Sequence, residues 1–303
     1  MFEDILGETT DVNINFQVPS RRNCVVTFFK DSIYISGGMD SNGHSSNRVD
    51  RVNPFSGNVS SVSPMSHARY GHCAAANDQY LFVFGGYSGL SYVDECEKYD
   101  AIHNRWTRLP DMIATRSDAA AVNVPSVGIV VVGGYLGDIN VKVDIVELLA
   151  PSTEGGKDWS WQTLAPMLQW RRSPAVEYFR GCIIVAGGND GEHITVECLP
   201  MTPDCRYSSQ WTQLAEVPHS RSGAISLAAF NGRLLFYNSN IWLKLETGFP
   251  FFVLKSYRGK DEVLEFLPES ETNESELEEF TWKPLFTRVA YGDQRLLVLR
   301  KRL

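Results

Sequence analysis

Short apolar runs that end in a pair of glycines recur along the chain. They read IYISGG, LFVFGG, IVVVGG and IIVAGG, and their first glycines are Gly37, Gly85, Gly133 and Gly187. Each run is rich in β-branched and aromatic residues and ends at a residue that favours turns, which is typical of a buried β-strand. The spacing of 48, 48 and 54 residues between these glycines predicts a repeat architecture in which each copy supplies one structural unit.

Three further sequence features recur with the same period as the glycine pairs. An arginine lies sixteen or seventeen residues before each glycine pair, at Arg21, Arg69, Arg116 and Arg171, and Arg221 precedes a fifth copy, LLFYNSN, without glycines. An acidic residue followed two positions later by an apolar one occurs at Asp50, Glu97, Glu147, Glu197 and Glu265. Trp106, Trp161 and Trp211 lie ten residues before the next arginine, and Val59 holds that place in the first copy. We therefore expect four short antiparallel strands per repeat, which is the content of one propeller blade.

The two ends of the chain carry complementary halves of a further repeat. Residues 2–17 have the spacing of a third and a fourth strand, and the C-terminus has two apolar runs, TRVAY and LLVL, around a Gly292–Asp293 turn. A blade built from both ends pairs strand edges that would otherwise be bare. The expected fold is therefore a single all-β domain over residues 1–303, a six-bladed propeller whose last blade is shared between the termini.

The fifth repeat holds two insertions. Residues 239–260 are apolar and aromatic and lie between its second and third strands, where they form either a wall of a binding site or an extra packed hairpin. Residues 268–280 are acidic and lie between the third and fourth strands, at the opposite end of the blade. Their composition is typical of a solvated loop.

The stretch MSHARYGHCAAANDQYLFVFGGYSGLSYVDECEKYDAIHNRWTRLPDM carries all of these marks in phase. It resembles the kelch repeat of BTB-kelch (kelch-like) proteins, closely over residues 16–240 and more loosely beyond. The resemblance implies a protein-binding module and no enzyme, with partner recognition for a cullin-type ubiquitin ligase as the most concrete role. Association with actin or the cytoskeleton is an alternative. A copper-oxidase-like propeller is the alternative from another class, but the Tyr/Cys/His copper cage that it needs is not found.

In kelch adaptors, the partner binds the face where the connections from fourth to first and from second to third strands meet. The corresponding positions here are Arg22, Arg69, Tyr70, Tyr87, Arg116, Ser117, Tyr135, Arg171, Arg172, Asn189, Arg221 and Ser222. Arginine and tyrosine often anchor interfaces, and a guanidinium binds carboxylates in a bidentate manner. The competing interpretation is that the periodic first arginines, Arg69, Arg116 and Arg221, brace their loops. Specificity would then lie at Tyr70 and Arg172.

Charge and motifs limit the other classes of function. The net charge of −8 arises from nine acidic residues between Asp261 and Glu279, so the rest of the chain is close to neutral and lacks a basic patch for nucleic acid. A ring of arginines on a nearly neutral body favours an acidic or phosphorylated peptide as the partner. A separate BTB or cullin-associated protein is a second expected partner.

No cofactor or metal is expected, because the sequence has no HExxH, GxSxG or phosphate-loop motif and its histidines lack metal-ligand spacing. The six cysteines contain no CxxC pair and lie mostly in apolar runs, which favours buried thiols in a reducing compartment. The acidic N-terminal segment MFEDILGETTDVN has no signal-peptide pattern, and no run of apolar residues is long enough to cross a membrane. We therefore expect a cytoplasmic protein without membrane contact.

Overall fold

The computed structural model describes residues 20–139, 141–152, 158–189, 194–201, 210–217, 224–230, 233–239, 244–246, 253–255, 260–268 and 280–289. Within these ranges the elements are β-strands, apart from one short 3₁₀ turn, η1 (Gly137–Ile139). No helix in the described part of the chain has the length and apolar character needed to span a membrane.

Twenty of the described strands form five four-stranded antiparallel sheets, which are the blades. Blade 1 contains β1 (Val25–Phe29), β2 (Ser32–Ser36), β3 (Val49–Val52) and β4 (Val59–Val62). Blade 2 contains β5 (Cys73–Ala76), β6 (Leu81–Phe84), β7 (Cys96–Asp100) and β8 (Arg105–Leu109). Blade 3 contains β9 (Ala120–Val124), β10 (Gly128–Val132), β13 (Val146–Pro151) and β14 (Trp159–Thr163). Blade 4 contains β15 (Ala175–Phe179), β16 (Cys182–Ala186), β17 (Ile194–Pro200) and β18 (Thr212–Val217). Blade 5 contains β19 (Ala224–Phe230), β20 (Arg233–Ser239), β23 (Lys260–Pro268) and β24 (Phe280–Val289).

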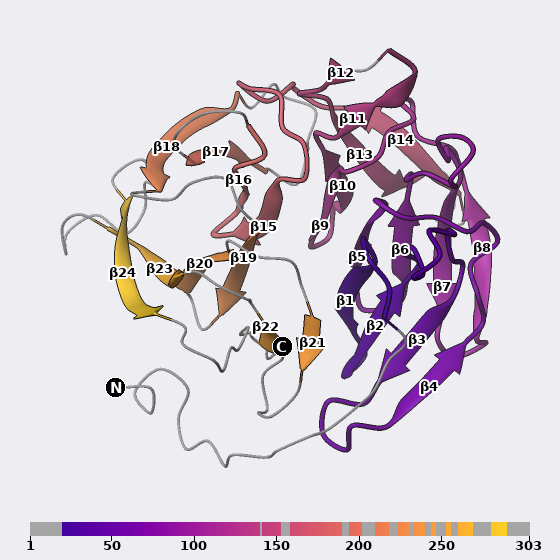
Figure 1. Cartoon of the computed structure of the whole chain (residues 1–303). Helices are drawn as coiled ribbons and strands as arrows, with labels where there is room; N and C mark the ends of the chain where they lie inside the picture. Colours follow the sequence, from indigo (N-terminus) through magenta and orange to yellow (C-terminus); the bar gives the residue numbers. More distant parts are fainter. Residues whose placement is uncertain are drawn as a thin grey trace.

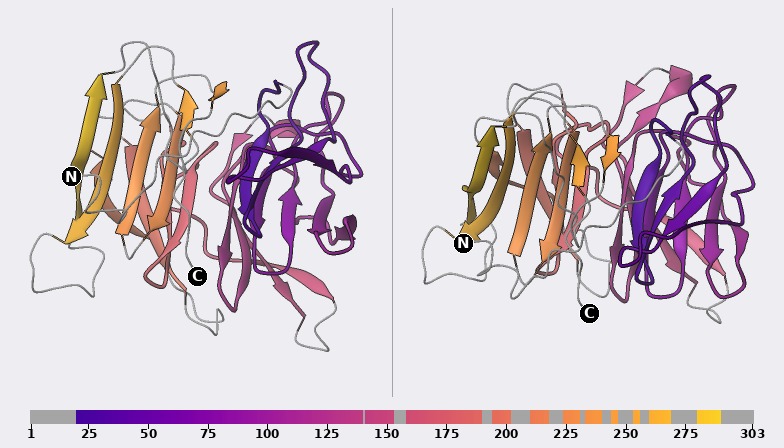
Figure 2. Two further views of the ribbon diagram at one scale, coloured as in Figure 1. Left: turned by 90° about the horizontal axis from the view of Figure 1, so that it is seen from below. Right: turned by 60° about the horizontal axis from the view of Figure 1, so that its bottom comes forward.

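The blades are arranged around a common centre as an all-β propeller. Figure 1 shows the first strands β1, β5, β9, β15 and β19 nearest the middle and the fourth strands at the outside. From β1 to β19, consecutive first strands contact each other. Figure 2 shows the strands upright, so the connections between them gather at the two ends of the molecule. The predicted strand marks are confirmed: the glycine pairs follow the second strands of blades 1 to 4, and the acidic residues lie in the third strands.

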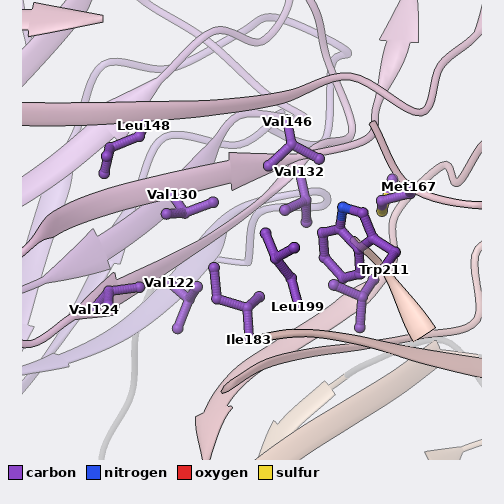
Figure 3. Packing of buried hydrophobic residues seen from close by; sticks show 11 residues of the cluster. Val122, Val124, Val130, Val132, Val146, Leu148, Met167, Ile183, Leu199 and Trp211 are labelled. Carbon is purple, nitrogen blue, oxygen red and sulfur yellow. The ribbon is translucent and has the colours of Figure 1, made fainter. Parts of the chain in front are cut away.

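The core lies between consecutive blades. Between blades 3 and 4, valines of β9 and β10 pack against Ile183 of β16, Leu199 of β17 and the indole of Trp211 (Figure 3). Residues Ile129–Val132 of β10 are fully buried, because a neighbouring blade covers each face of this sheet. Burial on both faces explains why the second strands are continuous apolar runs and lack the alternation of a half-exposed strand.

Two connections between second and third strands carry extra hairpins. In blade 3, β11 (Tyr135–Leu136) pairs with β12 (Val141–Lys142) (Figure 1). In blade 5, the 239–260 insertion contains β21 (Lys244–Glu246) paired with β22 (Val253–Lys255). The acidic segment begins at the end of β23 and returns at the start of β24, and residues 269–279 lie outside the described ranges. Chain order therefore assigns the two insertions of blade 5 to opposite ends of the blade.

The expected shared blade lies mostly outside the described residues, since residues 1–19 and 290–303 are not among them. One part of the prediction is corrected. Thr287, Arg288 and Val289 were assigned to the shared blade, but they pair with residues 260–262 as the end of β24. The reason is that no turn residue interrupts the pattern between Phe280 and Val289; Pro284 is accommodated next to a shift in register at Val263 and Leu264.

Candidate functional site

Three consecutive residues lead into the first strand of each of blades 1 to 4, and each of the three has a different environment. They are Arg21–Asn23, Arg69–Gly71, Arg116–Asp118 and Arg171–Ser173. We refer to them as the first, second and third positions of the entry triplet. All four triplets lie at the end of the propeller where the connections from fourth to first strands run.

The first arginine of each triplet is buried in an ion pair. Arg69, Arg116 and Arg171 contact Glu97, Glu147 and Glu197 at 2.8, 2.6 and 2.7 Å, and both side chains of each pair are at most 2% exposed. Arg21 pairs with Asp50 at 2.7 Å in the same way. Burial lowers the pKa of the three arginines, and the paired carboxylate acts in the opposite direction. The two periodic marks of the sequence are therefore the two halves of one recurring ion pair.

These arginines hold the blade together from inside. The guanidinium of Arg171 also donates to the carbonyl oxygen of Gly187 (2.6 Å), and Glu197 accepts from the backbone N–H of Leu168 (2.7 Å). The expectation that Arg69, Arg116 and Arg171 offer guanidinium groups to a partner is corrected, because their side chains have no access to solvent. The bracing interpretation applies to these three residues.

The glycine pairs are required by the same packing. If Gly133 carried a Cβ atom, this atom would lie 2.5 Å from the carbonyl oxygen of Arg171, at the entry to the next blade. The φ angle of Gly133 is +62°, in the left-handed region. That carbonyl accepts a hydrogen bond from the N–H of Gly134 (2.7 Å). A side chain at this position would push the two blades apart, so the glycine and the following arginine recur together.

The third position of each triplet links neighbouring blades through the backbone. The N–H of Gly71 donates to the oxygen of Asn23 (3.2 Å), that of Asp118 to Gly71 (2.7 Å), and that of Ser173 to Asp118 (2.7 Å). All four residues have φ between +52° and +60°. The result is a chain of main-chain hydrogen bonds that passes from blade 1 to blade 4 around the inside of the ring.

The second position and the residue after the glycine pair meet at the surface. Arg22 forms a two-residue bridge with Met39, Tyr70 with Tyr87, and Ser117 with Tyr135, each through reciprocal N–H to carbonyl hydrogen bonds. In blade 4 the N–H of Arg172 donates to the oxygen of Gly188, directly before the half-buried Asn189. The predicted positions from the two kinds of connection are thus brought together within each blade.

Four partly buried tyrosines gather there, and we call them the tyrosine cluster: Tyr70, Tyr87, Tyr92 and Tyr135. The rings of Tyr70 and Tyr87 are 5.5 Å apart between centroids, and those of Tyr87 and Tyr92 are 5.0 Å apart, both edge to face. Burial raises the pKa of Tyr92, and the phenols of Tyr135 and Tyr87 act in the same direction. Tyr92 was not among the predicted positions, although it ends the same YSGLSY connection that Tyr87 begins.

Arg172 completes the cluster on the side of blade 4. Its guanidinium lies 4.6 Å from the ring centroid of Tyr135 and contacts Asp118 Oδ2 at 2.9 and 2.7 Å. The side chain of Arg172 remains 48% exposed and that of Asp118 23%. Arg172 is therefore held in place from one side while its other side faces solvent. Asp118, which sequence reasoning missed, is the residue that positions it.

The remaining predicted positions differ in their accessibility. Arg22 is exposed on blade 1, whereas the side chain of Ser117 is buried, so Ser117 contributes its backbone to the bridge and not a displayed group. Arg221 and Ser222 lie outside the described residues. The expected ring of exposed arginines is thus replaced, over the described blades, by an aromatic surface flanked by Arg22 and Arg172.

No group of three or more His, Cys, Asp and Glu side chains in the described ranges is arranged to hold a metal ion. His72 is buried between blades and hydrogen-bonds Ser36 Oγ (2.8 Å). Burial lowers its pKa to about 3, and the guanidinium groups of Arg69 and Arg21 act in the same direction.

Comparison with known proteins agrees with this architecture. The Kelch motif matches residues 20–66 and 68–113. Kelch-like protein 25 of Xenopus tropicalis is 26% identical over 208 residues, and kelch-like protein 35 of Mus musculus is 30% identical over 192 residues. These alignments cover 66% and 62% of this chain but 33% and 30% of the relatives, so the chain spans about a third of their length.

A solved structure titled "Structure of YjhT" covers 80% of this chain and 84% of its own, with a TM-score of 0.58 and 15% identity. At this level of sequence identity, the likeness concerns the fold alone. The matched Kelch motifs, the blade geometry and the recurring Arg–Glu pairs together show a β-propeller that contains kelch repeats and is similar in sequence to the kelch-like proteins.

Proposed function

We propose that this propeller is a protein-interaction module whose partner binds over the tyrosine cluster and Arg172. The observation that carries the proposal is the gathering of four tyrosines and a half-exposed arginine at one end of the molecule. Tyrosine and arginine supply large contact area together with hydrogen-bonding groups, and they dominate the binding energy of many interfaces. The buried ion pairs beneath the cluster hold its backbone in place before a partner arrives.

The partner is proposed to present a short acidic or phosphorylated segment. Arg172 is fixed by Asp118 and by the ring of Tyr135, so a carboxylate or phosphate that approaches its open side meets a preorganised donor. Asp118 offsets part of this charge, so the aromatic rings share in recognition with the arginine. Arg22 on blade 1 supplies a second cation at the far side of the face.

The experiment is a selection of phosphorylated and unmodified peptide libraries on the purified propeller, followed by affinity measurements on the enriched peptides. Acidic or phosphorylated peptides should be enriched. Arg172→Ala should weaken their binding by about 5- to 150-fold, equivalent to about 1–3 kcal/mol for a lost charge-assisted contact. The matched control is Arg105→Ala, an exposed arginine at the start of β8 and so at the opposite end. Enriched peptides that bind both variants equally would show that the partner uses another surface.

The cellular context that we propose is recognition for a cullin-type ubiquitin ligase, with a BTB-type or cullin-associated protein providing the link. The similarity to kelch-like proteins 25 and 35 supports this context. Proximity labelling with the wild-type chain and with Arg172→Ala separates the two functions of such an adaptor. Labelling of the ligase components should persist in the variant, while labelling of the recognised protein should be lost. Absence of any cullin component from both samples would refute the ligase context.

A further inference from the structure

The surface of the tyrosine cluster continues outward along the β11–β12 hairpin. Tyr135 of β11 and Lys142 of β12 are direct partners in this antiparallel pair, which places their side chains next to each other. Arg172 stacks on Tyr135, and the ammonium of Lys142 lies 4.2 Å from the ring centroid of Trp170. Two neighbouring cation–aromatic contacts therefore connect the cluster to the outer part of the face.

Three large apolar side chains are exposed beyond these contacts, and we call them the outer apolar patch: Ile139, Leu168 and Trp170. Their exposed fractions are 65%, 55% and 37%. Ile139 belongs to the connection of blade 3, whereas Leu168 and Trp170 belong to the connection that enters blade 4. The N–H groups of Met167 and Arg171 donate to the carbonyl oxygens of Asp144 and Val143 (2.9 and 3.1 Å), so the two connections lie side by side.

This arrangement differs from the scattered apolar residues that any protein surface carries. The patch joins two connections of different blades, contains a tryptophan and borders two cations. Apolar patches with a polar rim are typical of surfaces that bind other proteins. Arg172 also makes the border attractive to carboxylates. One residue, Arg171, lies between Trp170 and Arg172, so their Cα atoms are at most about 7 Å apart.

We propose that the partner segment bound at the tyrosine cluster extends across β11 and β12 and places an apolar side chain on the outer apolar patch. The occupant is an acidic peptide with an apolar anchor, in which a carboxylate or phosphate for Arg172 is followed, two or three residues away, by a leucine or an aromatic residue against Trp170 and Leu168. This inference rests on the proposed function and defines the chemistry of the partner more narrowly.

The test uses a phage-displayed library of random twelve-residue peptides as the probe, selected in parallel on five forms of the full chain. They are the wild type, Arg172→Ala, two patch variants and one control. The patch variants are Trp170→Ala and the double variant Ile139→Ser with Leu168→Ser, which changes only exposed side chains and so preserves folding if Trp170→Ala does not. Ile102→Ser is the matched control, because Ile102 is an apolar residue 79% exposed in the turn between β7 and β8, at the other end of the propeller. Thermal unfolding verifies that each form is folded.

Wild type and Ile102→Ser should enrich acidic peptides with an apolar residue at a fixed distance from the acidic group. On the patch variants, that apolar preference should disappear, and the best wild-type peptide should bind at least tenfold more weakly. If enriched peptides depend on Arg172 but keep their apolar preference on the patch variants, the patch is not used. In that case the present inference fails, while the proposed function stands. If no enriched peptide depends on Arg172, the proposed function itself fails.

Discussion

At the scale of single residues, two neighbouring arginines with the same chemistry have opposite roles. Arg171 is 1% exposed and pairs with Glu197, whereas Arg172 is 48% exposed and pairs with the partly exposed Asp118. A buried carboxylate that loses its partner keeps its full desolvation cost, while an exposed ion pair contributes little to stability. Position within the triplet, and not residue type, therefore decides what each arginine does.

The two arginines give a matched pair of variants. Arg171→Met should lower the free energy of unfolding by about 3–5 kcal/mol, because Glu197 is left buried without its cation. Arg172→Met should lower it by less than about 1 kcal/mol. Urea denaturation of both variants measures the difference, and equal losses would contradict the assignment of structural and binding roles.

His72 should make stability depend on pH. Its pKa falls from 6.5 in the unfolded chain to about 3 in the folded protein, so the unfolded state takes up the proton first as the pH decreases. Between these two values, the contribution of His72 lowers the free energy of unfolding by about 1.4 kcal/mol for each pH unit of acidification. His72→Gln should reduce the slope of stability between pH 6.5 and 5 by that amount in chemical denaturation. Parallel slopes for the variant and wild type would exclude this role.

At the scale of the element, an indole at the fourth strand of blades 2, 3 and 4 hydrogen-bonds to the preceding blade. Trp106, Trp161 and Trp211 donate their Nε1–H to the carbonyl oxygens of Ser63, Pro110 and Ala165, each at 2.8 Å. Each acceptor directly follows, or lies two residues after, the fourth strand of the preceding blade. Val59 holds the same position in blade 1 and cannot donate such a bond, so blade 1 lacks this fastening.

Trp211→Phe tests the fastening. The phenyl ring keeps most of the packing in the core between blades 3 and 4 but leaves the carbonyl of Ala165 without its donor, so stability should fall by about 1–3 kcal/mol. Thermal or chemical unfolding gives the value, and Val59→Ala should cost less because no hydrogen bond is removed. A larger loss for Val59→Ala would mean that packing alone holds the seams.

The strands and the blade phase could be predicted from the sequence because they repeat. Glycine, arginine, glutamate and tryptophan recur at fixed distances in the sequence. Each of them makes a contact that is repeated within a blade or between consecutive blades. The pairing of Arg69 with Glu97 was not predicted, although the two marks keep a nearly constant separation. Tyr92 and Asp118 could not be found in this way, because residues that give one face its chemistry occur once and leave no period.

At the scale of the whole molecule, the two ends of the propeller are chemically distinct. The tyrosine cluster and the outer apolar patch lie at the end that carries the entry triplets. The connections between third and fourth strands, including the one that holds residues 269–279, lie at the other end by chain order. The closure of the ring by both termini stays a prediction, because the residues concerned lie outside the described ranges.

Deletion of residues 269–279 should leave the affinity for the selected peptides unchanged at physiological ionic strength. Charges at the opposite end are screened over a length of roughly 8 Å under these conditions. Fluorescence anisotropy with a labelled peptide measures the effect, and a tightening of several-fold on deletion would place the acidic loop in competition for Arg172.

The links through the third position of the triplets consist of main-chain atoms, and this has a consequence for how such a protein can change. Asn23, Gly71, Asp118 and Ser173 join the blades without regard to the side chains displayed one residue earlier. Substitution at Arg22, Tyr70 or Arg172 therefore alters the recognising surface while the frame beneath it stays the same. The second position of each triplet determines specificity, and the third position contributes to stability. The two properties can therefore evolve independently, and one propeller can acquire new partners without first becoming less stable.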